Sequence, residues 1–450
     1  MEKNKTYEVY IIDMGMNFEG IAKHEGKVIF VPGAIVSEVV KIKIIKDTKN
    51  YAIGKIEEII KKSEYRIEDE CNYSKRCGGC DCRHIEYNYT LDIKKNIVIN
   101  TLEKQEIDIS KVGDIYGMGV PYHYRNKVQY PVRNVNGKSI MGMFSKRSHD
   151  IIEVKECMLQ DARLDKFAQI MFKLAIENGL EGYNENTKVG DIKNIMVRVS
   201  KHFDEVLCIF VTNGERLVKD KRVKNVVEKL SKYNEVKGIV LNINKADNNV
   251  ILSDQNFVAY GKDFIQDKIE NYIFNISTES FFQVNTIGAE ILYNVLKNSL
   301  MLDKKETLLE LYSGVGTIGM FLSSDVKNVY GVEIVEDAVK MARENAKLND
   351  IGNVTYILGD AKVELEKLKE KGMYFNTIVV DPPRRGLDFE AMETIIQMKP
   401  EKIGYVSCNV STLARDLALL KEHYNIKSIN LVDMFPWTGH VETVVVLKRR

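Results

Sequence analysis

The sequence predicts an α/β protein whose last domain, residues 271–450, is a doubly wound, Rossmann-like sheet. From Thr307 onward, short runs of β-branched and apolar residues alternate with segments of helical periodicity. Two of these runs, 377–380 and 403–406, are followed directly by the polar motifs Asp381-Pro382-Pro383-Arg384 and Ser407-Cys408-Asn409. Parallel sheets of this kind hold their ligands at the carboxyl ends of the strands. We therefore expect the functional site at these two strand ends, where one motif offers a carboxylate and the other a thiol.

Length and composition indicate a multidomain protein. A chain of 450 residues is long for one core, so two or three domains are expected. Lys and Arg number 65 against 64 Asp and Glu, so any basic surface must be local. No apolar run is long enough to cross a membrane, and the first residues lack the apolar core of a signal peptide. We expect a cytoplasmic protein whose 7 cysteines are reduced.

Residues 1–62 are expected to form a small OB-like β-barrel. Glycines separate several strand-like runs, and in one of them Val40, Ile42 and Ile44 share one face. Barrels of this type are common platforms for single-stranded nucleic acid. Five cations could line a phosphate path, or they could belong to a solvated strand face: Lys23, His24, Lys41, Lys43 and Lys46.

Residues 63–270 are predicted to form a β-rich central domain that begins with a group of cysteines. The thiols concerned are Cys71, Cys77, Cys80, Cys82 and Cys157, and the first three follow the spacing Cys-x5-Cys-x2-Cys. Clustered thiols in a reducing compartment indicate a zinc site or an iron–sulfur cluster. The spacing slightly favours zinc, with His84 as a further candidate ligand. Spacing does not decide whether Cys82 or Cys157 completes the site.

Two further segments contain residues suited to ligand or RNA contacts. Tyr122–Lys127 mixes aromatic and cationic residues, which suits base stacking and phosphate contact or, alternatively, an amphipathic edge strand. At the start of the last domain, Phe281-Phe282-Gln283-Val284-Asn285 suits the lip of a pocket or a helix start with a packed Phe pair. Helices are predicted in the central domain over residues 87–103, 164–178 and 222–232.

The loop after the strand 307–311 indicates a nucleotide-containing cofactor. Gly314-x-Gly316-x-x-Gly319 fits the dinucleotide-binding pattern, and Glu333 stands where a ribose-binding acid belongs, so an NAD enzyme is one interpretation. Glu310, at the end of the strand before the loop, would repel a pyrophosphate but could accept from an ammonium group. This favours S-adenosylmethionine, with Glu333 on the ribose hydroxyls and Asp360 near the adenine.

The order and spacing of the motifs in the last domain resemble the RNA uracil-5-methyltransferase family. The motifs are Phe281–Asn285, Leu311–Gly314, Asp381–Arg384, Ser407–Asn409 and Gly439-His440-Val441-Glu442-Thr443. Near the amino terminus, Glu19–Ala22 and Val31–Ala34 resemble a TRAM domain, which favours RNA binding. This domain and the cysteine set together resemble the bacterial 23S ribosomal RNA branch of the family. The transfer-RNA branch generally lacks both.

The resemblance implies a role for each candidate residue. Cys408 would be the nucleophile and Glu442 the base. S-adenosyl-L-methionine would be contacted by Gln283, Tyr312, Glu333 and Asp381. A [4Fe-4S] cluster, in place of zinc, would be held by Cys71, Cys77, Cys80 and Cys157, which leaves Cys82 spare. The implied partner is RNA, most specifically 23S ribosomal RNA, and neither a membrane nor an obligate protein partner is expected.

The expected chemistry explains these residue types. Addition of a Cys408 thiolate to uracil C6 turns the ring into an enolate, whose C5 attacks the methyl group of the donor. Glu442 then removes the C5 proton, and the thiol leaves. The base must first leave its stack, and Phe281 or Phe282 is expected to stack on it. The alternatives are a non-catalytic iron–sulfur RNA-binding protein, an amino-group methyltransferase, and methylation of transfer RNA. The cluster itself is expected to be a structural staple.

Overall fold

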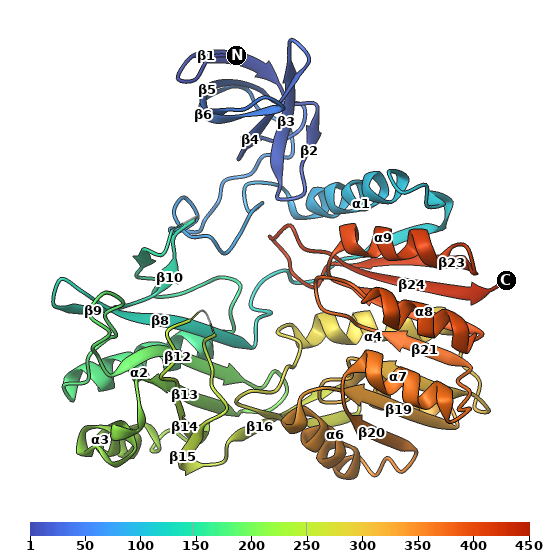
Figure 1. Ribbon diagram of the computed structural model, residues 1–450. Coiled ribbons are helices and arrows are strands. Elements are labelled where there is room, and N and C mark those ends of the chain that lie inside the picture. The colour runs from blue at the N-terminus through green and yellow to red at the C-terminus, as the bar shows by residue number, and fades with distance from the viewer. Residues whose placement is uncertain (147, 249) are drawn as a thin grey trace.

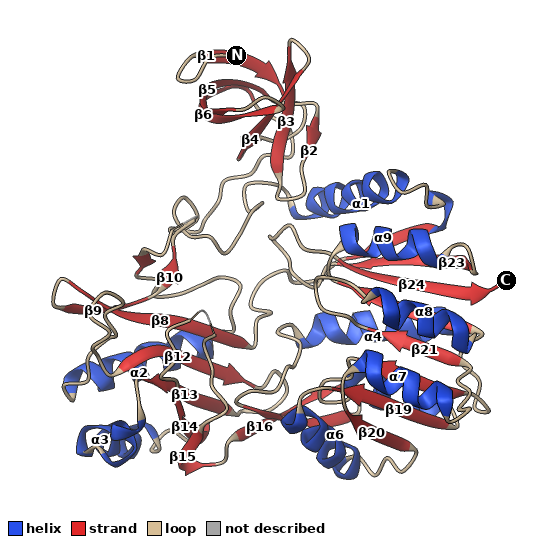
Figure 2. Ribbon diagram, viewed as in Figure 1, coloured by secondary structure: helices blue, strands red, loops and turns tan. Residues whose placement is uncertain are grey.

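The computed structural model describes residues 1–146, 148–248 and 250–450, and three principal sheets organise them. The amino-terminal sheet lies at one end of the molecule, and the central and carboxy-terminal sheets lie side by side below it (Figure 1). Most helices flank the carboxy-terminal sheet, whereas the amino-terminal sheet stands without a helix in its own segment (Figure 2). Across the described ranges, no helix is both long enough and apolar enough to span a bilayer.

The amino-terminal sheet has six strands in the order β1-β5-β6-β4-β3-β2 and encloses an apolar core of its own. The predicted alternation is confirmed, because Val40, Ile42 and Ile44 are fully buried whereas Lys41 and Ile45 are exposed. The strands are β1 (Thr6–Tyr10), β2 (Asp13–Met14), β3 (Glu19–His24), β4 (Lys27–Pro32), β5 (Val39–Asp47) and β6 (Tyr51–Lys61).

The central sheet also has six strands, in the order β15-β14-β13-β12-β8-β9. Helices α2 (Ala162–Glu177) and α3 (Lys221–Leu230) pack on one face and close a core that includes the buried Cys208, as predicted for that residue. The strands are β8 (Lys127–Val135), β9 (Lys138–Met141), β12 (Ile192–Val199), β13 (Val206–Thr212), β14 (Val236–Ile243) and β15 (Asn256–Gly261), with a short pair β10 (Met143–Phe144) and β11 (Ile151–Ile152) beside them.

The carboxy-terminal sheet has eight strands in the order β20-β19-β18-β21-β22-β24-β23-β7. The five strands from β20 to β22 are parallel to one another, and β24 runs antiparallel to both of its neighbours. The predicted doubly wound sheet is therefore present. The strands are β7 (Val112–Tyr116), β18 (Thr307–Leu311), β19 (Asn328–Glu333), β20 (Val354–Leu358), β21 (Thr377–Val380), β22 (Lys402–Ser407), β23 (Tyr424–Val432) and β24 (Glu442–Arg449).

Helices cover both faces of this sheet, because successive residues of each strand point to opposite sides. Leu308 belongs to the core under α4 (Thr286–Leu300), α5 (Thr317–Leu322) and α6 (Glu336–Leu348). Its neighbour Leu309 belongs to the core under α1 (Tyr87–Glu103), α7 (Ala361–Glu370), α8 (Phe389–Met398) and α9 (Val410–Leu420). Burial on both faces explains why these strands are continuous apolar runs in the sequence.

The structural units differ from the sequence boundaries of 63–270 and 271–450. Strand β7 pairs with β23, and α1 packs beside α9, so residues 87–116 complete the carboxy-terminal sheet. The hairpin of β16 (Phe264–Ile269) and β17 (Tyr272–Ser277) spans the boundary at 270 and packs on α6. Sequence order suggested a contiguous domain, but an open sheet edge and an uncovered helix face are buried by whichever segment reaches them.

Candidate active site

The carboxy-terminal sheet places its candidate ligands at one crevice. The strand order reverses between β18 and β21, which are hydrogen-bonded neighbours. In open α/β sheets, such a reversal opens the ligand crevice, because the connections leave to opposite faces there. The glycine loop follows β18, and Asp381 follows β21. The two sequence motifs therefore meet at the position expected for a cofactor.

The glycine loop is shaped by residues with positive φ angles. Tyr312 has φ 63°, Gly314 has φ 53° and Gly316 has φ 82°. A Cβ atom at Gly316 would lie 2.2 Å from the Tyr356 hydroxyl, so this position has no room for a side chain. The left-handed conformation of a tyrosine is costly and is held here by the tight turn. The loop is therefore a preformed, narrow turn.

Two glutamates hold the glycine loop by accepting hydrogen bonds from its backbone amides. Glu310 is buried, and its Oε2 accepts from the Gly319 amide at 3.0 Å. It therefore lies beneath the loop, and the expectation that it accepts from a ligand ammonium group is not supported. Glu333 is partly exposed and accepts from the amides of Gly314 and Val335, each at 2.9 Å. Carboxylate oxygens have further lone pairs, so Glu333 keeps acceptor capacity for ribose hydroxyls.

The predicted nucleophile and base end adjacent strands. In the antiparallel pair β22–β24, Ser407 is opposite Thr443. Cys408 and Glu442 are the next residues outward on the two strands, so the sheet brings them to the same edge. Cys408 is partly exposed, whereas Glu442 is buried.

Four ionisable side chains interact at this edge: Cys408, Glu442, Asp381 and Arg384. The pKa of Cys408 is raised to about 11 by burial and by the Glu442 and Asp381 carboxylates, while Arg384 acts to lower it. Burial and Asp381 raise the pKa of Glu442 to about 8, again with Arg384 acting in the opposite direction. Burial raises the pKa of Asp381 to about 7. Displaced pKa values of this kind are typical of sites that move protons.

The Asp-Pro-Pro-Arg loop is tied to the start of α9. The Arg384 carbonyl accepts from Asn409 Nδ2 at 3.0 Å and from Thr412 Oγ1 at 3.2 Å. Arg384 Nη2 lies 3.3 Å from His440 Nε2, on the segment that leads into Glu442. The loop thus places a guanidinium close enough to the thiol and the buried carboxyl to lower the pKa of both. Arg384 was not predicted to act in catalysis, although a cation three residues after the predicted Asp381 was a usable signal.

The aromatic pair before α4 separates into two environments. Phe282 is buried in the core against Phe274, so the expectation that it stacks on a base is wrong for this residue. Phe281 is 64% exposed and remains available. Gln283 is partly exposed, and its main-chain carbonyl accepts a hydrogen bond from Asn126 Nδ2 at 2.9 Å. Asn285 caps α4 by accepting from the Gly288 amide, so the helix start was also predicted correctly.

The central segment contains a second candidate site, here called the cysteine cavity. Four thiols line it, together with Arg83 and Arg125: Cys71, Cys77, Cys80 and Cys157. Cys82 lies elsewhere, buried in an apolar cluster with Phe18 and Ile93. Folding therefore brings the distant Cys157 to the other three thiols and directs Cys82 away, a choice that spacing could not make.

The donor set of this cavity suits an anionic iron–sulfur cluster. Among the residues that the structure describes, Arg83 Nη1 and Arg125 Nε are buried without a hydrogen-bond partner, and both residues line the cavity. A cluster with thiolate ligands would supply the missing acceptors. Within the described ranges, no group of three or more His, Cys, Asp or Glu side chains is close enough for a single metal ion. A cage of several irons spreads its ligands more widely than one ion does, so thiols arranged around a cavity fit a cluster better.

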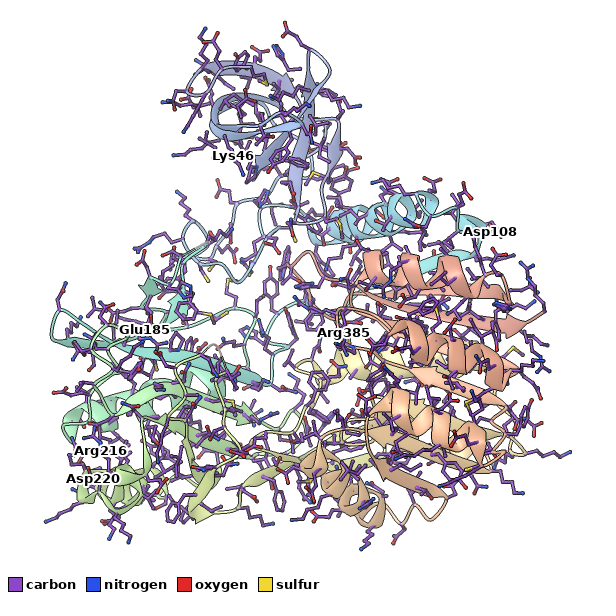
Figure 3. The ribbon with its side chains drawn as sticks, viewed as in Figure 1. Lys46, Asp108, Glu185, Arg216, Asp220 and Arg385 are labelled. Carbon is purple, nitrogen blue, oxygen red and sulfur yellow. The ribbon has the colours of Figure 1, made fainter. Side chains whose placement is uncertain are left out.

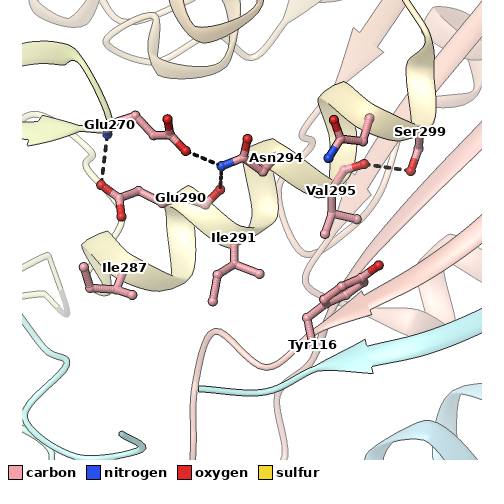
Figure 4. Close-up of a pocket in the computed structure, with 9 residues that line it drawn as sticks. Tyr116, Glu270, Ile287, Glu290, Ile291, Asn294, Val295 and Ser299 are labelled. Carbon is pink, nitrogen blue, oxygen red and sulfur yellow. Dashed lines mark hydrogen bonds between the residues drawn. The ribbon is translucent and has the colours of Figure 1, made fainter. Parts of the chain in front are cut away.

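Other surface features lie away from this chemistry. A hollow of about 410 Å³ lies between α4 and Tyr116 (Figure 4), and its walls include no residue of the candidate sites. Of the cations that could line a phosphate path or belong to a solvated strand face, Lys23, Lys41 and Lys46 are exposed, and Lys46 is marked on the amino-terminal unit in Figure 3.

The doubly wound sheet and its glycine loop define the class of enzymes that bind a nucleotide-containing cofactor, and the family match narrows this class to the S-adenosylmethionine-dependent methyltransferases. The chain belongs to the tRNA (uracil-5-)-methyltransferase family, whose profile matches residues 86–450. The TRAM domain profile matches residues 2–56, at the amino-terminal sheet. The chain is therefore an RNA methyltransferase with an amino-terminal TRAM domain.

Full-length relatives agree with this assignment. An uncharacterized RNA methyltransferase of Clostridium acetobutylicum is 41% identical over 100% of this chain and 98% of its own length. Another from Clostridium tetani is 40% identical over 99% of this chain and 97% of its own. The crystal structure of Pyrococcus abyssi tRNA (uracil-54, C5)-methyltransferase with S-adenosyl-L-homocysteine superposes with a TM-score of 0.77 at 24% identity, covering 98% of this chain and 99% of that one. This last likeness shows a common fold.

Proposed function

We propose that this enzyme transfers the methyl group of S-adenosyl-L-methionine to C5 of uracil in RNA through a covalent Cys408 adduct. The observation that supports this best is the shared sheet edge of Cys408 and Glu442, next to Asp381 and the glycine loop. A thiol and a carboxyl at one crevice suit a reaction that needs a nucleophile first and a base afterwards.

In the proposed reaction, the Cys408 thiolate adds to C6, and the electron pair moves to C5 as an enolate. C5 attacks the sulfonium methyl group, and S-adenosylhomocysteine leaves. Glu442 takes the C5 proton, the C5–C6 double bond re-forms, and the C6–S bond breaks. Arg384 favours the thiolate, since its positive charge lowers the pKa of Cys408. Gln283, Tyr312, Glu333 and Asp381 contact the methyl donor, and the exposed Phe281 stacks on the flipped base.

We propose 23S ribosomal RNA as the substrate. The TRAM domain joined to a four-cysteine cavity supports this choice. A transfer RNA is the second candidate, because the family profile carries the name of tRNA enzymes and the similar Pyrococcus abyssi structure is of one.

We also propose that Cys71, Cys77, Cys80 and Cys157 hold a [4Fe-4S] cluster of structural role, with Arg83 and Arg125 balancing its charge. When bound, such a cluster crosslinks the segment 71–80 to Cys157. Anaerobic purification should give a protein that contains iron and inorganic sulfide and absorbs visible light. Colourless, iron-free protein from cells able to assemble clusters would contradict this proposal, and so would loss of turnover on one-electron oxidation of an intact cluster.

The experiment that tests the function measures transfer of a labelled methyl group to two RNAs, 23S ribosomal RNA and bulk transfer RNA. We expect 5-methyluridine in the ribosomal RNA and its disappearance with Cys408→Ala. Label in transfer RNA alone would select the second candidate. An N-methylated product, or RNA binding without any transfer, would overturn the proposed chemistry.

A further inference from the structure

The loop that leads into Glu442 is held by parts of the chain far from it in sequence. This loop, residues 433–441, joins β23 to β24 and is called the base loop here. Lys94 of α1 forms a fully buried ion pair with Asp433 at 2.6 Å. Asn285 Nδ2 donates to the Met434 carbonyl at 2.8 Å, and the Tyr124 hydroxyl donates to the Pro436 carbonyl at 3.1 Å. The first part of the base loop is thus fixed by α1, by the start of α4 and by the segment before β8.

The last part of the base loop is fixed by the cysteine segment. Asp81 lies between Cys80, which lines the cysteine cavity, and the buried Cys82. Its Oδ2 accepts from the Gly439 amide at 3.0 Å, and its own amide donates to the Trp437 carbonyl at 2.8 Å. Asp81 therefore fixes the segment 437–439 through two hydrogen bonds, one at each end.

The conformation that these bonds hold is a strained one. Trp437 has φ 67°, in the left-handed region. Its indole Nε1 donates to the Pro121 carbonyl at 2.9 Å, and its ring lies against Tyr87 and Tyr122. A non-glycine residue keeps such a backbone only where its surroundings impose it. Without the Asp81 contacts, the segment after Trp437 would lose one of its constraints.

Gly439 is enclosed on two sides. A Cβ atom at this position would lie 2.6 Å from the Met16 carbonyl of the amino-terminal unit, so the base loop passes between that unit and Asp81. The next residue, His440, meets the Arg384 guanidinium, which acts on Cys408 and Glu442. A continuous chain of contacts thus runs from Asp81 through Gly439 and His440 to the site of the nucleophile and the base.

From these contacts we infer that Asp81 is a positioning residue for the release of the methylated base. The inference rests on the proposed function, because it concerns the step in which Glu442 removes the C5 proton and the C6–S bond breaks. Asp81 touches neither RNA nor the methyl donor in this role. It fixes the segment 439–441, and through it the approach of Glu442 and Arg384 to the adduct.

The test compares three variants with the wild-type holoenzyme on unmodified substrate RNA. Asp81→Ala removes the acceptor, and Asp81→Asn keeps an oxygen that can accept from the Gly439 amide. Asp108→Ala is the matched control, since it removes a carboxylate that accepts from the Ser110 amide at 3.0 Å on the far side of the carboxy-terminal unit (Figure 3). Two readouts are taken: the ratio of denaturation-resistant protein–RNA adduct to free 5-methyluridine in one turnover, and amide hydrogen exchange of residues 433–441.

Asp81→Ala should raise the adduct-to-product ratio about tenfold while methyl transfer itself changes less, and it should speed exchange in the base loop. Asp81→Asn and Asp108→Ala should both resemble the wild type. If Asp81→Ala does not fold, Asp81→Ser, which is polar but too short to reach Gly439, takes its place. Equal losses of both steps, or unchanged exchange in residues 433–441, would overturn the inference. Absence of 5-methyluridine from the wild-type reaction would instead reject the proposed function, and the exchange readout would still decide whether Asp81 fixes the loop.

Discussion

Cys408 and Glu442 occupy neighbouring positions across the antiparallel strands β22 and β24, one step beyond the Ser407–Thr443 pair. The reversed strand β24 is what makes them neighbours, because only an antiparallel return brings the start of β24 to the end of β22. The nucleophile and the base are therefore fixed by one register, and a change at either side chain should act on a separate step of the reaction.

Replacing Glu442 with Gln should trap the enzyme on its RNA. The amide cannot take the C5 proton, so the methylated adduct persists, and release of 5-methyluridine should fall by about 100-fold or more. A gel under denaturing conditions should show a methyl-labelled protein–RNA band. Free product at the wild-type rate would assign proton removal to another group.

The same substitution should stabilise the protein at alkaline pH. The folded-state pKa of Glu442 is about 8 against an ordinary value of 4.5, so the folded protein binds one proton more than the unfolded chain between these values. Stability contributed by the protonated form is therefore present below pH 4.5 and is lost as the pH rises to about 8. Glu442→Gln avoids this loss, which amounts to about 5 kcal/mol for a pKa raised from 4.5 to about 8. The melting temperature should rise relative to the wild type at pH 8.5 but not at pH 4.5, and equal shifts at both would contradict this account.

Removing the charge of Arg384 should move the pH dependence of adduct formation upward. Arg384 lowers the pKa of Cys408 and that of Glu442, so Arg384→Leu should shift the profile by about one pH unit and slow the reaction about tenfold near neutrality. The measurement is adduct formation with RNA containing 5-fluorouridine. Arg385→Leu is the control, because Arg385 pairs with Asp388 at the surface and should leave the pH profile in place. Identical shifts for the two variants would remove the special role of Arg384.

Alanine substitutions in the glycine loop should separate the cost of backbone strain from the cost of a steric clash. Gly314→Ala adds a methyl group where no heavy atom lies within 4 Å, so it should cost only the left-handed backbone strain of about 1 kcal/mol. Gly316→Ala would place the methyl 2.2 Å from the Tyr356 hydroxyl and should cost about 2 kcal/mol more. Without ligand, the melting temperature should therefore be highest for the wild type, lower for Gly314→Ala and lowest for Gly316→Ala. Equal melting temperatures for the two variants would show that Tyr356 moves aside freely.

The buried ion pair between α1 and the base loop should be important for stability. Lys94→Met removes the countercharge of the fully buried Asp433, which among the described residues keeps only a hydrogen bond from the neutral Tyr87 hydroxyl, and should cost about 3–5 kcal/mol. Lys95→Met, one residue along the same helix, breaks only an exposed contact with Asp114 and should change stability by less than about 0.5 kcal/mol. The double variant Lys94→Met with Asp433→Leu should recover part of the loss in thermal melting. A double variant no better than Lys94→Met alone would point to packing rather than charge.

Local pattern was enough for most of the secondary structure. The helix 87–103 and the strands 307–311 and 377–380 have the predicted bounds, because the helix has a clear period and the strands are short apolar runs that end at polar residues. The central domain was predicted less well, since its ends exchange partners with the carboxy-terminal sheet. Nothing in the sequence of strand β7 indicates that it will pair with β23.

The candidate site divides in the same way. Asp381, Cys408 and the glycine loop were visible because each follows a recognisable strand, and strand ends meet at one edge. The sequence predicted the helix that carries Lys94, but nothing in it indicated that Lys94 would form a buried ion pair with Asp433. Phe281 and Phe282 could not be told apart, because adjacent residues point to opposite sides and burial depends on what packs above them.

The sequence by itself determined the class of fold, the glycine turn and the residue types available for chemistry, because these depend on local period and on local backbone preference. Spacing left Cys82 and Cys157 open, the family resemblance implied Cys157, and the tertiary structure places Cys157 with the other three thiols. Only the tertiary structure decided that Phe281 rather than Phe282 stays exposed and that Asp81 holds the loop before Glu442. Each of these is a pairing between distant segments, and such pairings are set by which surfaces remain to be buried once the local elements exist.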